Sequence, residues 1–135
     1  MNTPSAESPR SLDTTDPARA AVLQAATGPL DEVFGDRVRL EVDNVNRIGA
    51  WVFVRGTMRD AGGGGPYYAG SSYEARRADG AMSDVYAALL RKTDNTSTDN
   101  DARAWQLSDY AIGPTDVAWL PWSNKHSTPR SLFEL

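Results

Sequence analysis

The sequence predicts a mixed α+β fold, in which an N-terminal helix packs on a four-stranded antiparallel sheet and an irregular C-terminal tail follows. Three observations support this prediction. An alanine-rich segment with helical signals comes first, four segments with strand patterns follow it, and the connections between those strands are short or polar. No second long helix separates the strands, so a parallel arrangement is not expected.

The helix is predicted to begin at Asp16 and Pro17. Aspartate is a good N-cap, and proline suits the first helical position because its missing N–H has no partner there. Ala18–Ala26 continues the helix with few residues that resist helical geometry. At Gly28 and Pro29 the helix either kinks or ends, and in the second case a short helix begins at Pro29.

After Gly35 the apolar residues alternate with charged ones, which is typical of a strand with one wet face. The apolar positions of this first strand are Val38, Leu40 and Val42. Asn44–Gly49 has turn chemistry, and we expect positive φ angles at Asn46 and Gly49. Ala50–Arg59 is more apolar, so it is predicted as a central strand with both faces covered.

The strand pattern is absent from Asp60 to Asp84, where we expect a long loop with one helical turn over Tyr73–Ala78. The glycine run Gly62–Gly65 could suggest a phosphate-binding loop. No Lys-Ser/Thr pair follows it, however, and Pro66 removes an N–H donor. A loop tip without a ligand is therefore the expectation.

Val85–Leu90 is predicted as the third strand, Thr93–Ala102 as a solvated connection and Arg103–Ile112 as the fourth strand. Strict alternation would place Trp105 and Leu107 on one face of the fourth strand. The other face would then present Gln106, Ser108, Tyr110 and Ile112. Thr115–Leu135 has apolar residues without a period, so we expect it to wrap the sheet as ordered irregular chain.

Composition argues against several classes of function. The 135 residues have a net charge of −4 and no basic stripe, which disfavours binding to nucleic acid and to anionic membranes. Cysteine is absent and His126 is the single histidine, so thiolate chemistry and sites that need two imidazoles are not possible. We expect no metal, no cofactor and no catalytic residue.

Residues 1–16 are rich in Ser, Thr, Pro and Asp, and we expect a flexible leader before a single domain over residues 17–135. The leader lacks the apolar stretch of an export signal, and no segment approaches the ~18 apolar residues of a membrane span. The expectation is a cytoplasmic protein, or a periplasmic one if a signal has been removed.

Acid/base and nucleophilic sites find little support in the spacing of polar residues. Asp109 and Asp116 flank the end of the fourth strand, but no pattern brings them to a shared face. Asp116 follows Gly113-Pro114 and can instead bond nearby backbone N–H groups in a turn. His126 lies in a polar segment, and no G-x-S-x-G motif supplies a nucleophile for it.

The aromatic residues are the strongest candidates for a binding surface. Trp119 and Trp122 are close together in the tail, Tyr110 precedes them, and Trp51 lies in the second strand. Such side chains give a large contact area with one polar group each. With Asp116 organising the turn, these residues could bind an unknown protein or a small apolar ligand. The alternative is that the tail tryptophans are core residues that attach the tail to the sheet.

A set of short motifs resembles a group of small bacterial proteins without an assigned activity. The motifs are Trp51-Val52-Phe53-Val54, Leu89-Leu90-Arg91-Lys92, Trp105, Gly113-Pro114-Thr115-Asp116-Val117-Ala118-Trp119, Pro129-Arg130 and Leu132-Phe133. The resemblance covers roughly residues 18–135 and is most specific in the G-P-T-D-V-x-W segment. The element order also resembles the cystatin-like and NTF2-like class, whose members bind ligands, bind proteins or catalyse reactions in the cone of the sheet. One clear long helix instead of three departs from the fuller NTF2-like pattern.

The sequence favours a non-enzymatic binding or interaction module. An NTF2-like small-molecule enzyme or carrier is the alternative, with Asp109 or Asp116 as the acid/base group. Its apolar walls would be Trp51, Phe53 and Tyr110. A third class is an inhibitor or immunity-type protein, which small acidic domains can be.

Overall fold

A computed structural model provides the structure of this chain. It describes residues 10–11, 17–61, 66–69, 71, 73–80, 82–93, 102–114, 119, 121–128 and 130–133. Gly62–Gly65 and Asp116, on which two of the expectations depend, lie outside the described residues. The expected leader includes Arg10–Ser11, which form strand β1, and its other residues also lie outside the description.

Two consecutive helices, α1 (Pro17–Ala26) and α2 (Gly28–Phe34), form the first layer. Of the two outcomes expected at the Gly28-Pro29 pair, the structure shows the second, because α1 ends at Ala26 and a new helix begins at Gly28. Proline in the first turn of α2 costs no hydrogen bond, since the N–H groups there have no intrahelical partner. A short 3-10 helix, η1 (Gly35–Arg37), then leads to the sheet.

The first long hairpin consists of β2 (Val38–Ile48) and β3 (Trp51–Asp60). Ile48 pairs with Trp51, so the turn contains two residues and Gly49 has φ 60°. The predicted turn over Asn44–Gly49 is therefore wrong except at its last residue, because β2 continues to Ile48.

Burial explains why β2 continues. Val45 and Ile48 are buried, and the Asn46 amide donates a 3.4 Å hydrogen bond to the Leu132 carbonyl. The positive φ expected at Asn46 is not found, since Ser127 is the one non-glycine residue with positive φ in the described chain. The polar side chain at position 46 makes a tertiary contact and not a turn.

The second half of the sheet contains β4 (Val85–Lys92) and β5 (Trp105–Ile112). The short helix α3 (Glu74–Ala78) lies where one helical turn was predicted, and the 3-10 helix η2 (Ala102–Ala104) precedes β5. Residues 94–101 of the predicted connection lie outside the described chain.

A β-bulge corrects the predicted faces of β5. The register shifts so that Leu90 pairs with Leu107 but Leu89 pairs with Asp109, which leaves Ser108 as the extra residue. Ile112 therefore lies on the same face as Trp105 and Leu107, and all three pack in one core. Strict alternation failed here because one inserted residue exchanges the two faces beyond it.

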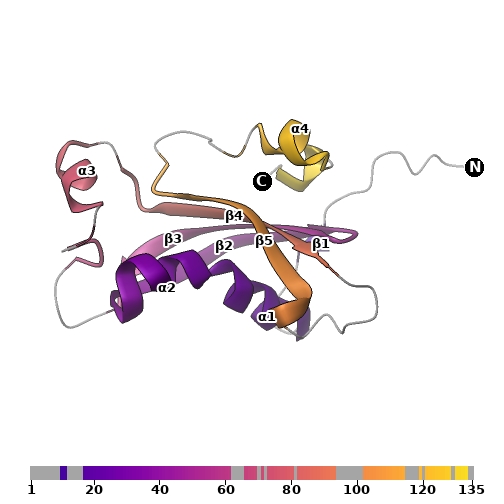
Figure 1. Ribbon diagram of the computed structural model, residues 1–135, viewed down its shortest axis with the longest axis horizontal. Helices are drawn as coiled ribbons and strands as arrows, with labels where there is room; N and C mark the ends of the chain where they lie inside the picture. The colour runs from indigo at the N-terminus through magenta and orange to yellow at the C-terminus, as the bar shows by residue number, and fades with distance from the viewer. Residues whose placement is uncertain are drawn as a thin grey trace, which may run out of the picture.

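The strands are ordered β1-β2-β3-β4-β5, and every neighbouring pair is antiparallel. The predicted α+β fold, with an N-terminal helical segment on a sheet of four long antiparallel strands, is confirmed. The two-residue strand β1 was not predicted. Helix α1 and helix α2 lie on one face of the sheet, and α4 (Trp122–His126) lies on the other (Figure 1).

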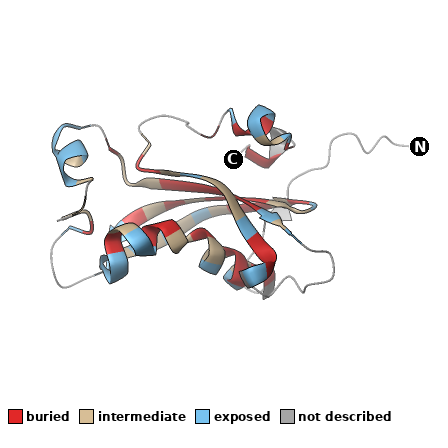
Figure 2. Cartoon of the chain, in the orientation of Figure 1, coloured by how far each residue is buried: buried red, intermediate tan, exposed pale blue. Residues whose placement is uncertain are grey.

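Two apolar cores flank the sheet, and Figure 2 shows buried positions on the helices, the strands and the tail. The helix-side core includes Val22, Leu30, Val54, Tyr86 and Leu90. The tail-side core includes Phe53, Leu89, Trp119, Trp122 and Leu132. Because β3 and β4 contribute to both cores, the expectation that the second predicted strand is covered on both faces is confirmed. The tail covers the second face with α4 and a 3-10 helix, η3 (Arg130–Phe133), so it is more regular than expected.

Candidate functional site

The outer edge of β5 is the first candidate site, because β5 ends the strand order. Gly113 donates its N–H to the Val85 carbonyl at 2.8 Å and accepts from the Ser83 N–H at 3.1 Å. Both bonds point toward the β4 side. The direction of backbone groups alternates along an antiparallel strand, so those of Tyr110 and Ile112 point outward. In the part of the chain that the structure describes, no strand pairs with this edge.

Tyr110 provides an apolar group at the same edge. It is the exposed large hydrophobic residue of the described chain, with 47% of its surface accessible. Its ring lies 6.4 Å from the ring of Tyr86, which belongs to the helix-side core. The bulge at Ser108 is responsible for this placement, since it exchanges the faces of the residues that follow.

Asp109 lies beside Tyr110 and makes three hydrogen bonds. Its Oδ1 accepts the backbone N–H of Tyr110 at 2.9 Å. Its Oδ2 accepts Lys125 Nζ at 3.0 Å and lies 2.9 Å from His126 Nε2, both from α4. We call this arrangement the Asp109 clamp. It occupies the outward N–H of Tyr110 and joins the middle of β5 to α4.

Burial raises the pKa of the Asp109 carboxyl, but the hydrogen bonds from His126 and Lys125 outweigh this effect and hold the pKa below its usual value of 3.8. The Asp109 side chain is 17% exposed and that of His126 is 19% exposed, whereas Lys125 is 65% exposed. The carboxylate is therefore charged and fully engaged at neutral pH, which does not suit a general base.

Helix α4 holds the clamp in place. Trp122 begins this helix and packs against Phe53, with ring centroids 6.3 Å apart. At the other end Ser127 adopts the left-handed conformation, and Ser123 Oγ donates a 2.8 Å hydrogen bond to the Thr128 carbonyl. The apolar side of α4 thus fixes the positions of Lys125 and His126 over β5.

The structure separates the aromatic residues predicted to form one surface. Trp119 and Trp122 are each about 5% exposed and contact Phe53, so they occupy the position that the core alternative predicts. Trp51 is partly exposed, between the guanidinium of Arg91 at 5.4 Å and the ring of His126 at 6.3 Å. Tyr110 remains as the exposed member of the predicted set.

The walls expected for an NTF2-like pocket do not meet. Trp51 and Phe53 pack in the tail-side core, while the Tyr110 ring lies on the helix side of the sheet, near Tyr86. Residues on opposite faces of one sheet cannot line a common cavity. Asp109, one of the two expected acid/base groups, is held in the clamp and not directed into an apolar pocket.

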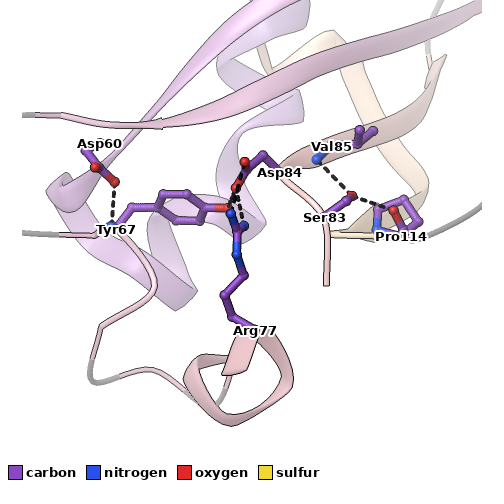
Figure 3. Close-up of polar contacts among 7 residues, drawn as sticks. All are labelled: Asp60, Tyr67, Arg77, Ser83, Asp84, Val85 and Pro114. Carbon is purple, nitrogen blue, oxygen red and sulfur yellow. Dashed lines mark hydrogen bonds and ion pairs between the residues drawn. The ribbon is translucent and has the colours of Figure 1, made fainter. Parts of the chain in front are cut away.

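A second polar cluster lies near α3, beyond the N-terminal end of β4 (Figure 3). Tyr67 donates its hydroxyl to Asp84 Oδ1 at 2.7 Å, and Arg77 forms an ion pair with the same carboxylate. The backbone N–H of Tyr67 donates to Asp60 Oδ1 at 2.8 Å. These residues line a cleft of about 190 Å³ together with Met58, Arg59, Pro66 and Tyr68.

The charges in this cleft are already paired within the protein. The hydrogen bond from Arg77 lowers the pKa of Asp84, and burial raises the pKa of the Tyr67 hydroxyl above its usual value of 10.0. Arg59 forms an ion pair with Glu41. The cleft therefore offers no unpaired cation or carboxylate among these groups, and its contacts connect the segment that contains Tyr67 and Arg77 to the sheet.

In the part of the chain that the structure describes, no group of three or more His, Cys, Asp or Glu side chains is arranged to hold a metal ion. No helix there has both the length and the apolar character needed to cross a membrane.

Sequence reasoning missed the Asp109 clamp because its members are 16 and 17 residues apart and belong to different elements. No spacing rule connects a strand residue with a helix that folds back over it. The same holds for Tyr67 and Asp84, which are 17 residues apart. The sequence gives one indication of this site: Asp109 is the only charged residue of Trp105–Ile112, the segment that forms β5.

Comparisons with known proteins found no match for this chain among protein-family models, curated proteins or solved structures.

Proposed function

We propose that this chain is a non-enzymatic protein-interaction module that binds an extended polypeptide segment along the outer edge of β5. The observation that supports this function is the outward direction of the Tyr110 and Ile112 backbone groups beside an exposed Tyr110 side chain. A strand edge whose backbone groups point outward selects an extended partner, because only a strand can match its spacing of donors and acceptors. Such a partner would replace Asp109 Oδ1 at the N–H of Tyr110.

The chemistry of the two sheet edges favours β5 as the docking edge. The part of β2 that extends beyond β1 has charged residues at alternating positions, and such charges discourage pairing with another strand. These residues are Arg39, Glu41 and Asp43. In β5 the only charged residue is Asp109, whose carboxylate is neutralised by α4. Pairing along β5 therefore meets less electrostatic resistance.

The exposed tyrosine would supply specificity. Tyrosine is enriched in interaction surfaces because it gives a large contact area at low cost in side-chain entropy. The ring of Tyr110 lies near the ring of Tyr86, which is fully buried in the core. The contact with this core residue limits the movement of the Tyr110 side chain. A partner residue opposite Tyr110 would meet both the ring and the backbone of this position.

As part of this proposal we place the chain in the cystatin-like and NTF2-like class of folds. The arrangement of α1 and α2 across one face of an antiparallel sheet supports that placement. The tail-side core, which covers the opposite face, supports an interaction role over a small-molecule site within the sheet.

Selection of peptides tests the proposed function. Random linear peptides displayed on phage would be selected on the full-length chain, and synthetic copies would be titrated against variants. We expect Tyr110→Lys to weaken binding at least about tenfold, which corresponds to about 1.4 kcal/mol. The matched control is Gln24→Lys, which places the same charge on an exposed position of α1. Peptides that bind Tyr110→Lys as tightly as the parent chain would contradict the proposal.

A further inference from the structure

We propose that a second cleft, at the end of α2, binds a small zwitterion: an α-amino acid with an apolar side chain. This cleft lies between η1 with the end of α2 and the segment that contains Tyr67, Ala69 and Ser71. It has a volume of about 350 Å³, and Tyr67 separates it from the 190 Å³ cleft described above, since this residue lines both. The site is distinct from the β5 edge, so it does not depend on the proposed function.

The size and the wall of the cleft suit a small molecule. Pockets for such ligands have volumes of about 300–1,000 Å³, a range that this cleft reaches and its 190 Å³ neighbour does not. Val33, Phe34 and Tyr67 provide apolar surface in its lining. The rings of Phe34 and Tyr67 pack edge to face with centroids 5.1 Å apart, and both residues belong to the helix-side core. This wall is held in place before any ligand binds.

Two charged side chains of opposite sign line the cleft, Asp36 and Arg37 of η1. Arg37 donates a hydrogen bond to the carbonyl oxygen of Ala69, which also lines the cleft. Within the described chain neither Asp36 nor Arg37 forms an ion pair. In the neighbouring cleft, by contrast, both arginines are paired with carboxylates. The two charges of η1 are therefore open to a ligand.

The other polar side chains of the cleft are engaged within the protein. Tyr67 donates its hydroxyl to Asp84, which lines the neighbouring cleft. Ser71 Oγ donates to the Tyr68 carbonyl oxygen at 2.7 Å and accepts the Tyr73 N–H at 3.1 Å. The charged side chains of η1 thus determine which ligand the cleft accepts.

A ligand with two opposite charges matches this pair of side chains. A simple carboxylate is attracted by Arg37 but repelled by Asp36, and a simple amine meets the reverse arrangement. An α-amino acid places its carboxylate on the guanidinium, which can bind it through two parallel hydrogen bonds, and its ammonium group on Asp36. The bond to Ala69 already restrains the Arg37 side chain, so less conformational entropy is lost on binding.

Titration of the full-length chain with free amino acids, followed by amide NMR shifts, tests the site. We expect L-phenylalanine or L-leucine to cause saturable shifts at Gly35, Arg37 and Ala69, with a dissociation constant of about 1 mM or lower. Phenethylamine lacks the carboxylate and 3-phenylpropanoate lacks the ammonium group, so each should bind at least about tenfold more weakly than L-phenylalanine. Equal binding of these three probes would overturn recognition of a zwitterion. Failure of both amino acids to saturate would overturn the site.

Variants assign the two charges. Arg37→Gln and Asp36→Asn change exposed residues, so both proteins should fold. We expect each to weaken L-phenylalanine binding at least about tenfold. Phenethylamine should bind Arg37→Gln no more weakly than the parent chain, and 3-phenylpropanoate should behave in the same way with Asp36→Asn. The matched controls are Arg39→Gln and Glu32→Gln, exposed positions outside the cleft lining, which should keep the affinity of the parent chain. Full affinity in Arg37→Gln or Asp36→Asn would overturn the inference, since the ligand would then occupy another site.

Discussion

The hydroxyl of Tyr86 in β4 donates a 2.6 Å hydrogen bond to the carbonyl oxygen of Ala26, the last residue of α1. Tyr86 is fully buried, and burial raises the pKa of its hydroxyl above the usual 10.0. Carbonyl groups in the last turn of a helix have no partner within the helix. This bond therefore connects the end of α1 to the centre of the sheet.

Removing that hydroxyl should cost stability. We expect Tyr86→Phe to lower the free energy of unfolding by about 1–2 kcal/mol, because a buried carbonyl loses its donor. The matched control is Tyr110→Phe, which removes the same atom from the exposed tyrosine and should change stability by less than about 0.5 kcal/mol. Urea denaturation of the three proteins measures both values. Equal losses in the two variants would contradict the role of the bond.

The tail tryptophans should behave as core residues. Trp122 is buried against Phe53, so we expect Trp122→Ala to destabilise the chain by about 3–5 kcal/mol. Trp51→Ala should cost clearly less, since this side chain is only partly buried. Thermal unfolding followed by near-ultraviolet circular dichroism checks the difference. A Trp122→Ala variant that keeps its stability would contradict the core role of Trp122. It would favour the other role predicted from the sequence, a contact with a partner.

Acid should weaken the chain through Asp109. Its pKa in the folded protein lies below the usual 3.8, so the ionised form stabilises the fold at pH values above 3.8. That contribution is lost as the pH falls through the lower folded value. We expect Asp109→Asn to be less stable than the parent chain at neutral pH and to lose less stability on acidification. Urea denaturation at several pH values measures the two slopes.

A variant that lacks only one of the side-chain partners of Asp109 serves as the control for this prediction. His126→Gln removes one of the two side-chain partners of Asp109 Oδ2 but leaves Lys125 in place. We expect its acid dependence to lie between those of the parent chain and Asp109→Asn. Parallel slopes for all three proteins would show that the clamp does not contribute to acid stability.

Two glycines should respond differently to alanine. A Cβ atom on Gly56 would lie 2.8 Å from the Glu41 carbonyl oxygen and 2.9 Å from Leu40 Cδ1. Since one of these atoms belongs to the backbone, we expect Gly56→Ala to cost about 1–3 kcal/mol. A Cβ on Gly28 would meet nothing within 4 Å apart from its chain neighbours. Because Gly28 is helical and precedes Pro29, which disfavours a Cβ there, the gain from replacing glycine is offset, and we expect Gly28→Ala to change stability by less than about 1 kcal/mol. Chemical denaturation measures the two changes.

Local patterns predicted much of the fold. The Gly28-Pro29 pair ended α1 because proline and the residue before it restrict the helix. The alternation after Gly35 gave the start of β2, and the apolar run in β3 indicated a central strand. Each of these features depends on residues that are close in sequence, and so a single chain was enough to predict them.

The remaining features depend on contacts between distant segments. Asn46 has turn chemistry but hydrogen-bonds the carbonyl of Leu132, so tertiary contact kept β2 extended. The bulge at Ser108 has no composition signal, and it reversed the faces of Tyr110 and Ile112. The site was predicted least well. Of its members Tyr110 was identified, but no local pattern indicated that Asp109 meets α4, and Asp116 lies outside the described residues.

The order of the strands has a consequence for the kinetics of folding. Every strand pairs with its neighbour in the sequence, and the two-residue turn between β2 and β3 closes at a small loss of loop-closure entropy. Helix α1, in contrast, contacts β5 and η2, which come much later in the chain. A long loop therefore closes when α1 docks, as it does when η3 docks on β2. We expect α1 to be little formed in the folding transition state, so that substitutions there change the rate of unfolding more than the rate of folding.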